Sequence, residues 1–174
     1  MADANDLKIA IERNIKALSL RPSIGRGTAT TVCRIRDGTT CDIKDGPWKL
    51  VADESPSDGG NGLGPDPGVL GRAALGSCIA MGYVMWAAVR EIPLDSVEVV
   101  VEADYDGNAL FGLDDSTPPG WSAMRYKAII SSPAPEEDIR ELVEFADYHS
   151  SLLGSFQRAL PVTRELQITA QAGK

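Results

Sequence analysis

A charge-free stretch lies near the middle of the chain: AALGSCIAMGYVMWAAV, residues 73–89. Pro65 and Pro67 suit the first turn of a helix, and Ile92-Pro93 ends that helix after Glu91. The run is about one turn shorter than the roughly 20 apolar residues that a bilayer-spanning helix requires. We therefore expect a buried central helix and no membrane association. Five small residues would let another backbone approach it closely: Gly71, Ala74, Gly76, Ala80 and Gly82.

Three β-strands are predicted before this helix. The segments are rich in Thr, Val and Ile and cover residues 28–36, 39–44 and 48–53. Asp37-Gly38 and Asp45-Gly46 separate them and are typical of hairpin turns. A meander of three strands follows from this pattern.

Two further segments surround the meander. Residues 5–20 place Leu7, Ile11, Ile15 and Leu18 at helical spacing, which predicts an amphipathic helix. Residues 53–67 are rich in Gly and Pro but lack the Lys-Ser/Thr ending of a phosphate loop. An ordinary loop is favoured there.

Two strands, a helix and a final strand are predicted after the central helix. The strands cover 97–105, 123–131 and 162–170, and an acidic connection at 106–121 joins the first two. The helix opens at Pro135, with one face made of Ile139, Leu142, Val143, Ala146, Ser150 and Leu153. Strands and helices come in blocks, which favours an α+β fold with largely antiparallel pairing.

Composition restricts the possible partners and location. The chain has 174 residues, the length of about one domain, so we expect a single domain over 1–174. Its net charge is −8, which disfavours nucleic acid and anionic membranes as partners. The acidic start, MADAND, lacks the positive charge of a secretory signal. We expect a cytoplasmic protein.

The cysteines and the histidine are too few for common metal sites. The chain has three cysteines (Cys33, Cys41 and Cys78) and one histidine (His149), which nearly excludes a metal site with four Cys or His ligands. This count does not exclude a metal site made of carboxylates. A loop of three or five residues centred on Asp37 would place Cys33 opposite Cys41, whereas a two-residue loop would pair Cys33 with Asp42. Two separate thiols in a reducing cytosol are favoured over a disulfide.

Cys78 is the candidate nucleophile, although taken alone it is more easily interpreted as an inert buried thiol. It lies too far along the predicted helix for the helix dipole to lower its pKa. A reactive Cys78 therefore requires a cation from elsewhere. Four arginines are candidates: Arg26, Arg34, Arg36 and Arg72, the last lying about 240° around the helix from Cys78 at 100° per residue.

The run Gly64-Pro65-Asp66-Pro67, followed by LGRAALGSC at residues 70–78, resembles the family of osmotically induced protein C and organic hydroperoxide resistance proteins (OsmC/Ohr). The segment FADYHSS at 145–151 fits the order of the same family, and the resemblance covers residues 25–170. It implies an intertwined homodimer in which antiparallel sheets wrap around two central helices, with active sites at the subunit interface. Residues 5–20 would be an additional N-terminal helix.

The resemblance also implies roles for individual residues. Cys78 matches the cysteine that attacks a hydroperoxide and becomes a sulfenic acid. Ser150 stands where the family has its second cysteine, and a one-residue slip would place His149 there instead. Gly68 replaces the family glutamate. Arg26 is the favoured match for the assisting arginine, and Arg36 is the alternative.

Two functions follow from this comparison. The first is a one-cysteine reductase of organic hydroperoxides that depends on an external thiol and uses no cofactor or metal. The second is a dimeric protein that has lost turnover and binds a small apolar ligand in the interface pocket. For His149, a role in capping the end of the later helix is favoured over catalysis.

Overall fold

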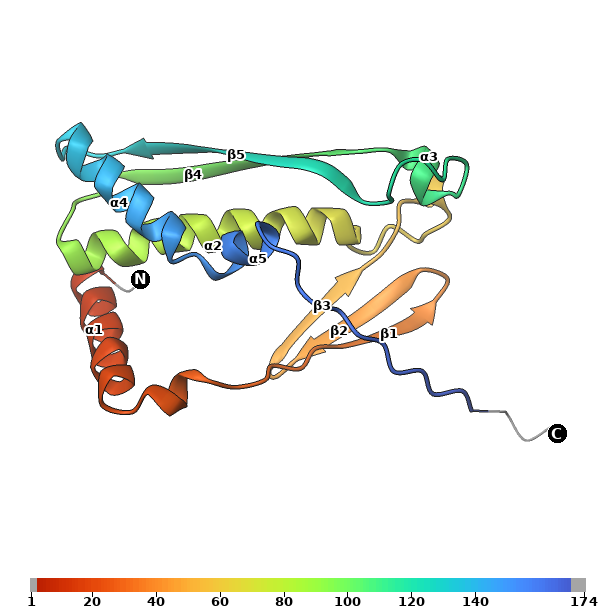
Figure 1. Cartoon of the computed structure of the whole chain (residues 1–174), viewed down its shortest axis with the longest axis horizontal. Helices are drawn as coiled ribbons and strands as arrows, with labels where there is room; N and C mark the ends of the chain where they lie inside the picture. The colour runs from red at the N-terminus through yellow and green to blue at the C-terminus, as the bar shows by residue number, and fades with distance from the viewer. Residues whose placement is uncertain (1–2, 170–174) are drawn as a thin grey trace.

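Two antiparallel sheets and one long helix organise the structure, a computed structural model that describes residues 3–169 (Figure 1). The first sheet has the order β1-β2-β3, with strands Val32–Asp37, Thr40–Asp45 and Trp48–Ala52. The second pairs β4 (Ser96–Tyr105) with β5 (Trp121–Ser131). All pairings are antiparallel, which confirms the α+β prediction.

The predicted central helix is α2, Pro67–Arg90. It starts where the Asp66 carboxylate accepts a hydrogen bond from the Val69 N–H at 2.8 Å, and it ends at Glu91, which has a left-handed φ of 56°. By length and composition α2 could cross a membrane. It packs against α1, β4, α4 and α5 of the same chain. Only six of its 24 residues are buried, whereas Met81, Val84 and Met85 are exposed, so the helix that we expected to be buried is buried along one face alone within the single chain.

The hydrophobic core forms where α2 meets the second sheet and the later helices. Its centre consists of buried Leu75, Ile79, Tyr83, Ala146 and Leu153. A Cβ added to Gly71 would lie 2.5 Å from the Trp121 ring, and one added to Gly76 would lie 3.1 Å from Val101 Cγ2. Small residues on α2 thus allow the β4–β5 layer of the same chain to approach the helix closely.

The other helices surround this core. They are α1 (Ala4–Leu20), α3 (Gly107–Leu110), α4 (Glu136–Tyr148) and α5 (Ser151–Phe156), with short 3-10 turns η1 (Pro22–Gly25) and η2 (Pro56–Asp58). Helix α1, predicted at 5–20, packs on α2, and Lys8 Nζ lies 2.7 Å from Glu91 Oε1. Figure 1 shows α4 and α5 along one side of α2, with the β4–β5 ribbon above it.

The prediction of one continuous helix through Leu153 is wrong. Helix α4 ends at Tyr148, and α5 begins at Ser151. The Ser150 hydroxyl accepts a hydrogen bond from the Leu153 N–H at 3.3 Å, so this serine is the N-cap of a new helix. The apolar spacing continues through the junction, which is why periodicity alone missed the break.

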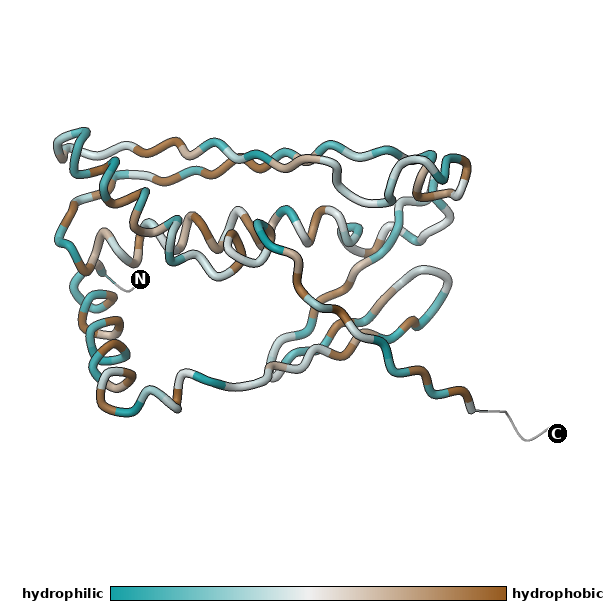
Figure 2. Tube along the Cα trace, in the orientation of Figure 1, coloured by the Kyte–Doolittle hydropathy of each residue, from teal (hydrophilic) through white to brown (hydrophobic). Residues whose placement is uncertain are grey.

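The predicted strand at 162–170 is also wrong over its described part. Residues 162–169 form no strand, and Ala170 lies outside the described residues. The segment leaves α5 and crosses the first sheet in the view of Figure 1, and its apolar residues are brown along the tail in Figure 2. Val162 is 92% exposed. Strands β1, β3, β4 and β5 each have a free edge, but residues 162–169 pair with none of them, and alternation alone does not make a strand without a paired edge.

Smaller differences concern boundaries. Strand β1 begins at Val32 rather than at residue 28, since residues 28–31 have no partner strand. The acidic connection at 106–121 contains the short helix α3, whose N-cap Asp106 accepts from the Asn108 N–H. Local capping of this kind was not recognised in the sequence.

A buried carboxylate fixes the loop before α2. Asp53 is 2% exposed. Its oxygens accept hydrogen bonds from five donors: the hydroxyls of Thr39 and Thr40 at 2.8 Å and the N–H groups of Glu54, Asn61 and Leu63 at 2.9, 3.2 and 3.2 Å. Burial raises the pKa of Asp53, but these hydrogen bonds outweigh it and lower the pKa to about 2. The loop therefore depends on an ionised Asp53.

Candidate functional site

Cys78 lies on α2, opposite the start of α5. Its Sγ is 3.5 Å from Ser150 Oγ and 3.8 Å from Ser151 Oγ. The side chain is partly exposed. The break between α4 and α5 makes Ser150 the N-cap and Ser151 the first residue of α5, so the start of this helix faces the sulfur.

Donors from α5 favour the thiolate form of Cys78. Burial raises the pKa of the thiol, but hydrogen bonds from the Ser150 hydroxyl, the Leu152 N–H and the hydroxyl and N–H of Ser151 lower it more. The net effect holds the pKa of Cys78 below its ordinary value. These hydroxyl and amide donors thus lower the pKa of Cys78, as a nearby cation would.

The predicted arginines lie elsewhere in the single chain. Arg36 Nε is 3.3 Å from Asp42 Oδ2 on the first sheet. Arg26 is exposed and follows η1, where its backbone N–H donates to the Ser23 carbonyl. The Arg72 guanidinium lies beside Gly68, toward the start of α2. Among the described residues, Cys78 has no hydrogen bond with any of these side chains.

His149 forms the end of α4. Its Nδ1 is 2.7 Å from the Phe145 carbonyl oxygen, and its ring centroid lies 4.2 Å from that of Phe145 and 5.9 Å from that of Trp86. The ring therefore packs in a cluster of aromatic side chains with Trp86 of α2 and Phe145 of α4. Of the two residues considered at the position of the family's second cysteine, Ser150 is the one that contacts Cys78.

The remaining cysteines lie in the hairpin of β1 and β2. Its register differs from both registers that the sequence suggested, in which Cys33 would lie opposite Cys41 or opposite Asp42. Cys33 pairs with Ile43, and Cys41 pairs with Ile35, because an irregularity follows Ile35. Neither the Cys33–Cys41 pair nor the Cys33–Asp42 pair forms. Burial, and then the neighbouring Cys33 thiol, raise the pKa of Cys41. Both cysteines are free thiols.

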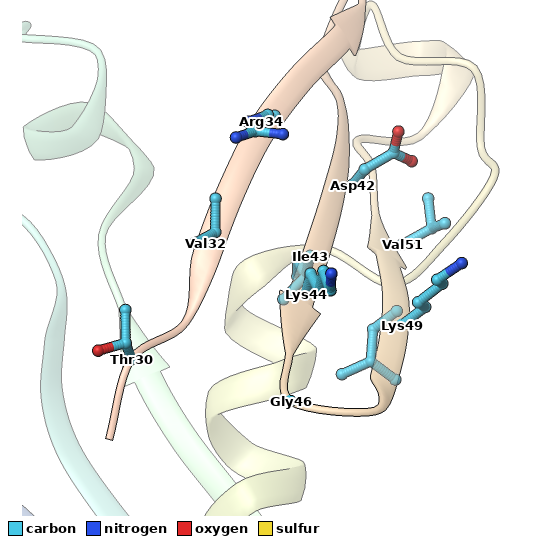
Figure 3. Close-up of a pocket in the computed structure, with 10 residues that line it drawn as sticks. Thr30, Val32, Arg34, Asp42, Ile43, Lys44, Gly46, Lys49 and Val51 are labelled. Carbon is cyan, nitrogen blue, oxygen red and sulfur yellow. The ribbon is translucent and has the colours of Figure 1, made fainter. Parts of the chain in front are cut away.

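A large cavity lies away from the thiol, on the first sheet (Figure 3). Its volume is about 850 Å³, and its charged lining residues are Arg34, Asp42, Lys44 and Lys49. It contains no cysteine among its lining residues. Within residues 3–169, no three His, Cys, Asp or Glu side chains gather as a metal site would require.

Two groups that contact Cys78 were not predicted from the sequence: the Ser151 hydroxyl and the N–H of Leu152. The signal was present, since two serines followed by Leu-Leu are typical of a helix N-terminus. Their contact with Cys78 could not be read from local pattern, because Ser150 is 72 positions from Cys78.

Comparison with protein families matches residues 59–165, more than half of the chain, to the family described as OsmC-like protein. The chain belongs to the OsmC-like family. This confirms the resemblance that the motif around Cys78 suggested, and the matched segment contains Cys78, Ser150 and Ser151. Among curated proteins, no match to this OsmC-like chain is found.

Solved structures share the OsmC-like fold at low identity. An OsmC-like protein from Mycoplasma pneumoniae matches with a TM-score of 0.65 and 14% identity, over 75% of this chain and 88% of that one. An organic hydroperoxide resistance protein OsmC from Legionella pneumophila matches with a TM-score of 0.55 and 19% identity, over 76% and 92%. A putative organic hydroperoxide resistance protein from Vibrio cholerae, with captopril bound in one of its active sites, matches with a TM-score of 0.50 and 14% identity, over 76% and 87%.

Proposed function

We propose that this OsmC-like chain is a one-cysteine, thiol-dependent reductase of organic hydroperoxides, with Cys78 as its nucleophile. The observation that carries the proposal is the position of Cys78 Sγ, 3.5 Å from Ser150 Oγ and 3.8 Å from Ser151 Oγ. Donors at this distance favour the thiolate, which is the nucleophilic form of cysteine. The organic hydroperoxide resistance proteins of similar fold support the choice of substrate class.

The first half of the reaction oxidises Cys78. Its thiolate attacks the terminal oxygen of the hydroperoxide, so an S–O bond forms as the O–O bond breaks. The leaving alkoxide takes a proton and departs as an alcohol. Sulfur loses two electrons and becomes a sulfenic acid, while the hydroperoxide gains them.

The second half requires an external thiol. Ser150 lies at the oxidised sulfur but cannot form a disulfide, because its side chain has oxygen in place of sulfur. An external thiol therefore attacks the sulfenic acid, which gives a mixed disulfide and water. A second external thiol then releases Cys78 as a thiol and leaves as the oxidised, disulfide form. The reducing cytoplasm that we propose as the location would supply such thiols.

We further propose that the active form is a homodimer. Ile35, Trp48 and Leu50 lie on one face of the first sheet, and each is more than half exposed. Apolar side chains of this size favour burial against another surface. A second copy would also offer Arg26 or Arg36 as a cation for Cys78, which neither supplies within the single chain.

Light scattering at micromolar concentration measures the oligomeric state. We expect a particle of twice the 18.5 kDa chain mass. Trp48→Glu, which places a charge on the apolar face, should shift the protein to monomer, and Lys49→Glu on the other face should not. A monomeric parent protein would contradict the homodimer.

The experiment that tests the proposed function is the pH dependence of Cys78 alkylation by iodoacetamide, measured in a Cys33→Ser, Cys41→Ser protein. We expect a midpoint below the roughly 8.5 of a free cysteine. Ser150→Ala removes one donor, so its midpoint should rise by about half a pH unit or more. An ordinary midpoint, together with saturable binding of an apolar probe, would favour the binding protein without turnover.

A further inference from the structure

A carboxylate with two phenol partners lies next to the thiol site. Asp147, in the last turn of α4, accepts hydrogen bonds from the Tyr83 hydroxyl at 2.8 Å and the Tyr126 hydroxyl at 2.6 Å. Tyr83 is on α2 and fully buried, and Tyr126 is on β5 and half-buried. Three elements of the fold therefore meet at one side chain.

Both phenols are kept in the neutral form that can donate. Burial, followed by the hydrogen bond to Asp147, raises the pKa of Tyr126 to about 12 and raises the pKa of Tyr83 further. Tyr83 donates to Oδ1 and Tyr126 donates to Oδ2, so each carboxylate oxygen has its own partner. No lysine or arginine among the described residues forms an ion pair with Asp147.

Asp147 also shapes the junction between α4 and α5 through its backbone. Its carbonyl accepts a hydrogen bond from the Ser150 N–H at 3.1 Å. The Ser150 hydroxyl is in turn 3.5 Å from Cys78 Sγ. Tyr83 and Cys78 belong to the same helix, so the carboxylate ties the junction directly to the helix that carries the thiol.

We infer that Asp147 is a positioning residue for Cys78, holding the α4–α5 junction through Tyr83 and Tyr126 so that the donors of α5 face the sulfur. The inference rests on the proposed function, since the position of these donors matters only if Cys78 reacts as a thiolate. Donor geometry decides how strongly a hydrogen bond favours the charged form, so a small shift of the junction changes the thiolate fraction.

The test uses the Cys33→Ser, Cys41→Ser protein, in which Cys78 is the one remaining cysteine, and compares variants at Tyr126, Asp147 and Tyr148. Tyr126→Phe and Asp147→Asn each remove part of the carboxylate–phenol contact, and Tyr148→Phe is the matched control, because Tyr148 neighbours Asp147 and is 87% exposed. The pH profile of Cys78 alkylation and the melting temperature are measured for each variant. We expect Tyr126→Phe and Asp147→Asn to slow alkylation below pH 7 roughly threefold or more, as a midpoint raised by half a unit requires. Tyr148→Phe should match the parent.

The outcomes separate the inference from the proposed function. A lowered melting temperature with an unchanged alkylation midpoint would mean that Asp147 has a structural role alone, and would overturn the inference while the proposed function stands. An ordinary midpoint in the parent protein would overturn both. Tyr126→Phe is the primary variant, because Tyr126 is less buried than Tyr83 and its loss is less disruptive to the core.

Discussion

Hydroperoxide turnover should disappear in Cys78→Ser and persist, at a reduced rate, in Ser150→Ala. A serine hydroxyl at position 78 is a far weaker nucleophile than a thiolate and cannot cycle through a sulfenic acid, so we expect a loss of about 1000-fold or more. Ser150→Ala keeps the nucleophile and loses one of several donors, which predicts a roughly tenfold or smaller loss. The measurement is consumption of cumene hydroperoxide with dithiothreitol as the external thiol.

The hairpin thiols provide the control for this prediction. Cys33 and Cys41 lie on the first sheet and share no hydrogen bond with Cys78 among the described residues. A Cys33→Ser, Cys41→Ser protein should therefore retain the parent rate. Loss of turnover in that protein, with retention in Cys78→Ser, would place the chemistry on the hairpin and contradict the proposed site.

Asp53→Asn should lower the melting temperature by roughly 5–10 °C at neutral pH, because an amide cannot accept all five hydrogen bonds and leaves buried donors unsatisfied. The folded-state pKa of about 2 lies below the unfolded value near 3.9. The contribution of the Asp53 charge is thus fully present above the unfolded pKa and is lost as the pH falls through about 2. Thermal unfolding followed by circular dichroism between pH 2 and 7 measures both effects.

An exposed aspartate is the matched control. Asp115 is exposed and makes no hydrogen bond among the described residues, so Asp115→Asn should melt like the parent. Asp53→Asn should also lose part of the acid dependence of stability that the parent shows. Equal melting temperatures for Asp53→Asn and Asp115→Asn at pH 7 would mean that the Asp53 contacts do not hold the loop.

Elements with strong local signals could be predicted from the sequence. The apolar run and its flanking prolines located α2, the Leu and Ile spacing located α1, and the Asp-Gly turns located the first sheet. Each of these signals lies within the element that it predicts. The junction at Ser150 failed because the apolar face continues across it, and the cap that breaks the helix is a local hydrogen bond.

Features that depend on distant partners could not be predicted from periodicity. Cys78 could be singled out by its motif, but its donors come from the start of α5, at the N-cap Ser150 and at Ser151. The carboxylate–phenol contact joins Asp147 to two residues on other elements. The segment 162–169 alternates as a strand does but pairs with no described strand, and periodicity does not show whether a pairing forms.

Peptide mass spectrometry after one equivalent of organic hydroperoxide tests the one-cysteine mechanism most directly. With dimedone present as a trap for sulfenic acid, we expect that the Cys78 peptide carries the dimedone adduct and that no disulfide joins Cys78 to Cys33 or Cys41. Sulfenic acid condenses rapidly when a thiol is positioned beside it, and Ser150 occupies that place. A Cys78 disulfide with either hairpin cysteine, or an unmodified Cys78 beside oxidised Cys33 and Cys41, would contradict the one-cysteine mechanism.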